Sequence, residues 1–127
     1  MLQVHFMKIL LLFCLVVVCS PVAFAQQTLP LDSLYIVTYT TGPKWDHTKA
    51  PNEQPYFTEH SANLGKLRKE GVIKAGARYA EKGIIFITAS SIVAAREIIF
   101  ADQAVLNQLF IADVQKLNVF YEGCIER

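Results

Sequence analysis

Two side chains far apart in the sequence have the chemistry of a proton-transfer pair. His60 lies in the stretch 55–71, where steps of three and four place it on one helical face with three apolar residues: Phe57, Leu64 and Leu67. An imidazole in an apolar stripe needs a partner, and Asp102 is the candidate. A carboxylate that holds one ring nitrogen leaves the other free to accept a proton. We therefore expect His60 to be a general acid or base and Asp102 to orient it.

Both members of this pair also have a structural interpretation. A lone histidine on an apolar helix face is commonly a hydrogen-bonded core residue. Asp102 follows the expected second helix, where the helix macrodipole makes a carboxylate mildly unfavourable. This misfit favours a specific role for Asp102 over that of a surface charge, and the sequence leaves both interpretations open.

Candidate substrate-binding residues lie on the expected strands. Gly76 is in mid-strand, where a glycine marks a bulge or a close approach by a ligand or by the His60 ring. Arg78 lies two residues on, on the same side of the strand, and either anchors an anionic substrate or pairs with a surface carboxylate. Three tyrosines either line the same cavity or belong to the core: Tyr35, Tyr39 and Tyr79.

The only tryptophan, Trp45, lies in a long loop at residues 41–54. Turn residues and a lack of periodicity predict the loop. Loops of this length are uncommon in compact domains and are often functional. The loop is either a lid that brings Trp45 over a pocket or a surface loop that the tryptophan pins down.

The elements that must position these residues follow the order β-α-β-β-α-β. We expect strands at 33–40, 72–80, 84–89 and 111–121, and helices at 55–71 and 92–101. This is the order of an α+β fold, the ferredoxin-like plait, in which both helices cover one face of an antiparallel sheet. The last strand is expected to point four residues inward: Val114, Leu117, Val119 and Tyr121.

Local signals predict the boundaries of these elements. Asn52 is expected to cap the first helix, with Pro55 in its first turn and Gly71 at its end. Ser90 or Ser91 is expected to cap the second helix, and residues 103–109 to add a further helical turn. Residues 81–83 predict a tight turn between the two middle strands.

Two of the strands are apolar on both faces. Residues 34–37 and 84–87 do not alternate between apolar and polar, so both faces of the sheet are expected to be dry. The chain has no spare element for the second face, and an open hydrophobic face would invite aggregation. We therefore expect a homodimer that packs sheet against sheet.

The first 25 residues read as a cleaved secretion signal. Lys8 precedes an apolar run at 9–19, and residues 23–25 form an A-x-A cleavage site. The run is shorter than the roughly 20 apolar residues of a membrane span, so no stable membrane anchor is expected. Residues 26–32 form a tether and 33–127 a single domain. The protein is expected to be exported, to the periplasm or beyond the cell.

Charge and motifs exclude several classes of function. The chain has 12 basic and 11 acidic side chains, and loss of Lys8 leaves it formally neutral, which argues against nucleic acid or anionic membrane as a partner. A Gly-rich phosphate loop, C-x-x-C, a nucleophile elbow and H-E-x-x-H are all missing from the sequence. Outside the signal only two histidines remain, His47 and His60, so neither a metal site nor a cofactor is expected.

A single cysteine, Cys124, remains after removal of the signal. One cysteine cannot form an internal disulfide. In an oxidising compartment it is either buried and inert or pairs between chains.

Scattered positions along the domain form a pattern found in one protein family. His60 is followed by Leu64, glycines stand at 71, 76 and 83, and Asp102 follows the second helix. In this the chain resembles the YCII-related family of small dimeric α+β barrel proteins. The resemblance implies that His60 and Asp102 are the active-site pair, and it implies a lyase, dehydrochlorinase-like or isomerase activity. The chain departs from the family where Gly-Pro is replaced by Gly76-Ala77 and Asp-Pro by Asp102-Gln103.

Three functions are therefore in competition. The first is an exported, cofactor-free homodimer that isomerises a small molecule or eliminates a group from it by proton transfer. In that enzyme, Arg78 or the Trp45 loop would clamp the substrate. The second is a ligand-binding or structural module in which the His60–Asp102 pair is only a satisfied polar contact. The third is haem or oxygen chemistry, which other dimeric α+β barrels perform.

Overall fold

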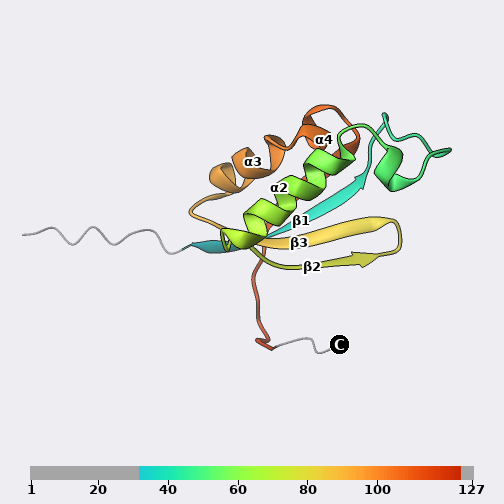
Figure 1. Ribbon diagram of the computed structural model, residues 1–127. Helices are drawn as coiled ribbons and strands as arrows, with labels where there is room; N and C mark the ends of the chain where they lie inside the picture. The colour runs from blue at the N-terminus through green and yellow to red at the C-terminus, as the bar shows by residue number, and fades with distance from the viewer. Residues whose placement is uncertain (1–31, 124–127) are drawn as a thin grey trace, which may run out of the picture.

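A four-stranded antiparallel sheet carries the helices on one of its faces (Figure 1). This computed structural model describes residues 32–123. The elements are β1 (Ser33–Thr41), η1 (Pro51–Glu53), α2 (Phe57–Lys69), β2 (Ile73–Tyr79), β3 (Lys82–Ala89), α3 (Ile92–Phe100), α4 (Gln103–Leu106) and β4 (Phe110–Lys116). The predicted α+β class and β-α-β-β-α-β order are confirmed. The helical turn predicted within residues 103–109 is α4, and η1 is an additional short helix. The predicted signal peptide, residues 26–31 of the tether and Cys124 lie outside the described residues.

The strands are ordered β2-β3-β1-β4, and each neighbouring pair is antiparallel. β1 is central: it pairs with β3 from Ser33↔Ala89 to Tyr39↔Gly83 and with β4 from Tyr35↔Lys116 to Thr41↔Phe110. The end of β1 therefore lies beside the starts of β3 and β4. This end of the sheet, under the first turns of α2, is where the candidate site forms.

The hydrophobic core lies between the sheet and the helices. Its members are alternate residues of β1 and β3 with inward residues of α3 and β4: Tyr35, Val37, Tyr39, Ile85, Ile87, Ala89, Ala95, Ile99 and Val114. The intervening residues of β1 and β3 point to the opposite face, and four of them are half-buried apolar side chains: Leu34, Ile36, Ile84 and Phe86. Both faces of these strands thus carry apolar side chains, and the expectation that the second face is dry stays a prediction. No helix of the described residues covers the second face (Figure 1).

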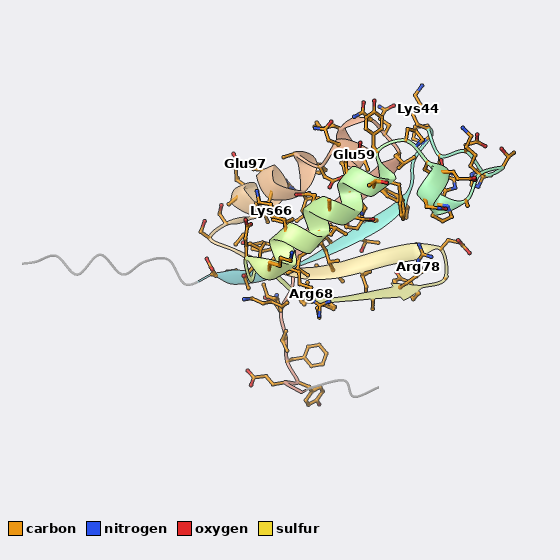
Figure 2. The ribbon with its side chains drawn as sticks, viewed as in Figure 1. Lys44, Glu59, Lys66, Arg68, Arg78 and Glu97 are labelled. Atoms are coloured by element: carbon orange, nitrogen blue, oxygen red, sulfur yellow. The ribbon has the colours of Figure 1, made fainter. Side chains whose placement is uncertain are left out.

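The apolar stripe of α2 is confirmed, but the helix begins later than predicted. His60 and Leu67 are buried, and Phe57 and Leu64 are half-buried. Charged residues of the same helix, such as Glu59 and Lys66, project into solvent (Figure 2). The predicted end is also confirmed, because Gly71 has a φ of 76° directly after the last turn.

The predicted cap of α2 is wrong. Asn52 lies in η1 and Pro55 precedes the helix, whose N-cap is Tyr56 in a left-handed conformation with no side-chain cap. The cause is Gln54, whose buried side chain is hydrogen-bonded to the preceding loop. The chain at Gln54 is therefore extended, and it must turn sharply at Tyr56 before the helix can start.

The β2–β3 hairpin differs from its prediction in two respects. Its turn consists of Ala80 and Glu81 and not of residues 81–83, because Tyr79 and Lys82 already pair as strand residues. Two-residue turns suit the right-handed twist of paired strands. The irregularity of β2 falls between Ile73 and Ala75, whereas Gly76 pairs regularly with Ile85. The bulge considered at Gly76 thus lies nearer the start of the strand.

Asp102 plays a different local part from the one that the sequence suggests. Ser91 caps α3, as predicted, by accepting a hydrogen bond from the Ala94 amide. Asp102 is not a misplaced charge at the end of α3, because it is the N-cap of α4, where its Oδ1 accepts from the Ala104 amide at 3.0 Å. A carboxylate is favourable at a helix start, so the macrodipole argument from the sequence is wrong.

The last strand is shorter than predicted. It begins at Phe110 and ends at Lys116. Val114 is buried as predicted and Leu117 is half-buried, whereas Val119 and Tyr121 are exposed, Tyr121 at 86%. Among the strands of residues 32–123, β4 pairs only with β1, which begins at Ser33. The last bond across this pair runs from the Leu117 amide to the Leu34 carbonyl.

Candidate active site

The fold brings His60 and Asp102 into direct contact. His60 Nδ1 lies 3.0 Å from Asp102 Oδ1, and the two side chains are only 8% and 1% exposed. α2 supplies the histidine, and the turn between α3 and α4 supplies the carboxylate. Because α2 packs against α4, the two residues meet although 42 positions separate them in the sequence.

Asp102 is held from three directions. Besides the contact with His60, Asn63 Nδ2 donates to its Oδ2 at 2.7 Å and the Ala104 amide donates to its Oδ1. Burial by itself raises the pKa of Asp102, but the hydrogen bonds from His60, Asn63 and Ala104 outweigh burial and bring the pKa below its ordinary value. Asp102 is therefore ionised at neutral pH and can only accept hydrogen bonds.

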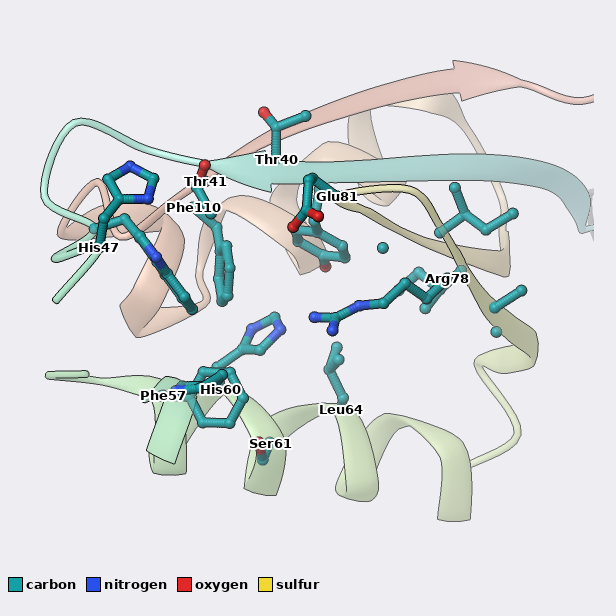
Figure 3. A pocket seen from close by; sticks show the side chains of 18 residues that line it. Thr40, Thr41, His47, Phe57, His60, Ser61, Leu64, Arg78, Glu81 and Phe110 are labelled. Carbon is teal, nitrogen blue, oxygen red and sulfur yellow. The ribbon is translucent and has the colours of Figure 1, made fainter. Parts of the chain in front are cut away.

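An ionised Asp102 fixes the tautomer of His60. Since the carboxylate only accepts, Nδ1 of the imidazole must carry the proton, which leaves Nε2 as the acceptor of a neutral ring. Within residues 32–123, Nε2 has no hydrogen-bond partner. The ring projects from α2 into a cavity, toward Arg78 (Figure 3). The arrangement thus presents one proton-accepting nitrogen to whatever occupies the cavity.

Sequence reasoning missed Asn63, although a signal was available. Asn63 lies three residues after His60, and residues at this spacing share a helix face. A polar residue one turn beyond a buried histidine is therefore a candidate second donor to the same carboxylate.

The cavity has a volume of about 680 Å³ and lies between α2 and the adjacent end of the sheet (Figure 3). Three of the predicted substrate-binding residues line it together with His60: Trp45, Gly76 and Arg78. Gly76 faces the Ile85 side chain, and a Cβ there would lie 3.4 Å from Ile85 Cγ2. A volume of this size is typical of small-molecule sites.

Tyr35 is placed differently from the other predicted binding residues. It is a core residue and is not among the residues that line the cavity. It lies four residues before Tyr39 on β1, which corresponds to about 13 Å along a strand. Of the other tyrosines considered, Tyr39 lines the cavity and Tyr79 is exposed, with Lys82 Nζ 5.9 Å from the centre of its ring.

Aromatic rings form one wall of the cavity, and Phe110 is at its centre. Its ring lies 4.9 Å from His60, 5.5 Å from Trp45 and 6.3 Å from Phe57, measured between ring centroids. Sequence reasoning missed Phe110, because its position depends on the pairing of β4 with the end of β1 at Thr41. No local pattern encodes that pairing.

The Trp45 loop is held in a definite shape by Gln54. The Gln54 side chain accepts from the Asp46 amide at 3.0 Å and donates to the Asp46 and Lys49 carbonyls at 2.6 and 3.3 Å. At the start of the loop, a Cβ on Gly42 would collide with the Gln108 carbonyl. Trp45 packs on Phe110 and lines the cavity.

The hydroxyl oxygen of Tyr39 is buried and has no hydrogen-bond partner. It is the one such polar side-chain atom within residues 32–123. Its ring touches both His60 and Phe110, with centroid distances of 5.2 and 6.2 Å. Burial, and secondarily the negative charge of Asp102, raise the pKa of Tyr39 far above its ordinary value. The hydroxyl thus stays protonated and can donate a hydrogen bond.

In the described part of the chain, residues 32–123, no group of three or more histidine, cysteine, aspartate and glutamate side chains is placed to hold a metal ion. None of its helices has the length and apolar character needed to cross a membrane.

Comparison with known proteins finds no match, either to a protein-family model or to a curated protein.

Proposed function

We propose that this protein is an acid–base enzyme without a cofactor, in which His60 moves a proton on a small molecule bound between α2 and the sheet. The observation that carries the proposal is the 3.0 Å contact between Asp102 and His60 Nδ1, made by a ring that lines a cavity. An imidazole held in one tautomer by a buried carboxylate is a recurring general base in enzymes.

The geometry supports a two-step proton transfer. Nε2 of His60 takes a proton from a carbon of the substrate. In an isomerisation, the electron pair of the broken C–H bond forms a new double bond while the pair of an adjacent double bond shifts to the next atoms, and the imidazolium then returns the proton at the far carbon. In an elimination, the C–H pair forms the double bond as a leaving group departs with its own electron pair, and the imidazolium passes the proton to the leaving group or to water. Asp102 stabilises the imidazolium, and the aromatic wall around Phe110 keeps water from the reacting atoms.

The resemblance to the YCII-related family supports the same roles for His60 and Asp102. On this proposal the domain is a ferredoxin-like plait whose helix-free sheet face packs against a second copy to form a dimeric α+β barrel. Support comes from the half-buried apolar residues of β1 and β3 on that face and from Ile111 beside them, which is 54% exposed. We also propose export after removal of residues 1–25, on the signal pattern in the sequence.

The proposal is tested with a panel of small lactones, enones and β-halogenated acids. Incorporation of deuterium from D₂O and release of halide are measured by NMR for the wild-type protein and three variants. His60→Ala is expected to lower the rate about 10²–10⁴-fold, the usual contribution of a positioned acid–base group. Asp102→Asn should also lower it, because an amide can donate to Nδ1 and favour the wrong tautomer.

Arg96→Ala is the control, since Arg96 is an exposed residue of α3 and does not line the cavity. This variant should retain the wild-type rate. A rate unchanged by His60→Ala refutes the role given to His60. Compounds that bind in the cavity without any His60-dependent proton exchange support the alternative of a non-catalytic binding module.

A further inference from the structure

The Tyr39 hydroxyl needs an acceptor that the described part of the chain does not supply. The residue is 5% exposed, and burial of an unpaired hydroxyl is unfavourable, so such groups in proteins nearly always have a partner. Tyr39 lines the cavity beside His60. An oxygen acceptor of a bound molecule could therefore satisfy it.

The sheet places Arg78 opposite Tyr39 across a gap. Arg78 pairs with Gly83 and Gly83 pairs with Tyr39, so the three residues form one row across β2, β3 and β1 on the helix-covered face. The middle residue has no side chain, which leaves a slot between the arginine and the tyrosine. None of the ion pairs within residues 32–123 involves Arg78, and its guanidinium points toward His60 in the cavity (Figure 3).

Besides Arg78 and Tyr39, the ionisable residues that line the cavity are His60, Glu81 and His47, and the last two are exposed. The negative charge of Glu81 opposes the binding of an anion. Asp102 does not line the cavity, and its carboxylate is hydrogen-bonded to three donors. Within the part of the chain that the structure describes, Arg78 is thus the only arginine or lysine that lines the cavity. An anionic group next to Arg78 and Tyr39 would receive one charged and one neutral donor.

Three aromatic residues form one wall of the cavity: Trp45, Phe57 and Phe110. Hydroxyl-bearing residues also line it: Thr40, Thr41 and Ser61. Flat rings of this kind suit a planar, apolar molecular body. A volume of about 680 Å³ leaves room for a small organic acid.

We propose that the cavity binds a small organic carboxylate, whose carboxylate group is held by the Tyr39 hydroxyl and the Arg78 guanidinium while its planar body lies against the aromatic wall. The proposal rests on the proposed function, because it names the substrate class of the same site. It places the body of the molecule near His60, the group proposed to move the proton. Tyr39 thereby becomes a specificity-determining residue.

The test compares acids with their uncharged amides. Benzoate, cyclohexanecarboxylate and 2-furoate, and the three corresponding amides, are titrated into the purified full-length protein. Binding is followed by the fluorescence of Trp45, the only tryptophan in the chain, and checked by calorimetry. At least one acid is expected to bind about tenfold or more tightly than its amide, as a hydrogen bond to a charged group allows. If no acid is preferred over its amide, the proposal is overturned.

Variants of Tyr39 and Arg78 test whether these two side chains cause the preference for acids over amides. Tyr39→Phe and Arg78→Met should each lower the affinity for the preferred acid about tenfold and leave the amide unchanged. Glu81→Gln should raise the affinity for the acid severalfold. Arg96→Met is the control, since Arg96 is exposed on α3 and does not line the cavity. An acid preference that survives both Tyr39→Phe and Arg78→Met places the anion elsewhere and overturns the proposal.

Separate measurements distinguish effects on folding and on proton transfer from effects on ligand binding. Tyr39→Phe removes only an unpartnered hydroxyl, so the thermal midpoint of this variant should equal or exceed that of the wild type. If Tyr39→Phe does not fold, the acid preference of Arg78→Met alone tests whether the anion binds at this position. His60→Gln should keep the acid preference while losing proton transfer. Acid preference without His60-dependent exchange would refute only the proposed function. Exchange that depends on His60 in a protein with no acid preference would refute only the ligand class.

Discussion

At the scale of single residues, Asp102 couples the stability of the fold to the state of the site. Its carboxylate caps α4, accepts from Asn63 and holds His60. Three donors converge on one buried group, so its removal leaves each of them without a partner. The residue that orients the imidazole is therefore also a structural residue, and activity and stability must be measured separately in its variants.

The lowered pKa of Asp102 predicts how stability changes with pH. A carboxyl whose pKa is lower in the folded than in the unfolded state stabilises the fold fully above about pH 4, the ordinary unfolded pKa. This contribution is lost as pH falls through the folded-state pKa. Asp102→Asn should be less stable than the wild type at pH 7, by about 1–3 kcal/mol, and should lose less stability on acidification.

Urea unfolding at a series of pH values from 2 to 7 measures this difference. Asp113→Asn is the control, because Asp113 is an exposed residue of β4. If the wild type and Asp102→Asn lose the same amount of stability below pH 4, the pH dependence of stability does not arise from Asp102.

At the scale of elements, two junctions place the aromatic wall. The start of the Trp45 loop is tied to β4 by the bond from the Gly42 amide to the Leu109 carbonyl at 2.7 Å. The end of the loop is tied back on itself by Gln54. Together they fix Trp45 and Phe110 beside the first turns of α2. The geometry of the site thus depends on loop residues that have no chemical role.

Replacing a glycine by alanine should have opposite effects on stability at the start of the Trp45 loop and within α2. Gly42→Ala should destabilise the protein by about 1–3 kcal/mol, because its Cβ would meet the Gln108 backbone carbonyl and the chain would have to move. Gly65→Ala is the matched change within α2, where a Cβ has nothing within 4 Å. It should stabilise the protein by about 0.5–1 kcal/mol.

Chemical denaturation of both variants gives the two values. Trp45 fluorescence should shift in Gly42→Ala and not in Gly65→Ala, since only the first lies at the base of the tryptophan loop. A neutral Gly42→Ala with unchanged fluorescence would mean that the junction tolerates a side chain.

At the scale of the whole molecule, the helix-free face of the sheet is the principal unexplained surface. Side chains of β1 and β3 on this face are apolar, and no helix of the described residues lies over them (Figure 1). A second copy that presents the same face would bury both, as symmetric dimers do. The proposed dimer is therefore testable through one residue at the centre of the face.

Phe86→Lys should convert the dimer into a monomer, because two copies would place charges in an apolar interface. Phe86 pairs with Ile36 and Ala75 in the middle of the sheet. Sedimentation at micromolar concentration measures the association, and circular dichroism checks the fold. Val93→Lys is the control, since Val93 is an exposed apolar residue of α3, on the helical side. A wild-type protein that sediments as a monomer contradicts the dimer.

The sequence by itself determined the secondary-structure order and the apolar stripe of α2, because periodicity and turn residues are local properties of the chain. It also singled out His60, Asp102, Gly76, Arg78 and Trp45, since each combines an unusual residue type with an unusual position. Local signals failed at Asn52, at residues 81–83 and at Val119 and Tyr121. There the outcome depended on a buried glutamine, on strand register and on where a partner strand begins.

Only the tertiary structure decided which residues meet. The contact of α2 with α4 brings Asn63 and His60 to Asp102, and the pairing of β4 with β1 brings Phe110 to His60. The row through Gly83 sets Arg78 opposite Tyr39, and burial leaves the Tyr39 hydroxyl without a partner within residues 32–123. These relations join positions tens of residues apart, so no local pattern contains them, and they arise only when the helices pack on the sheet.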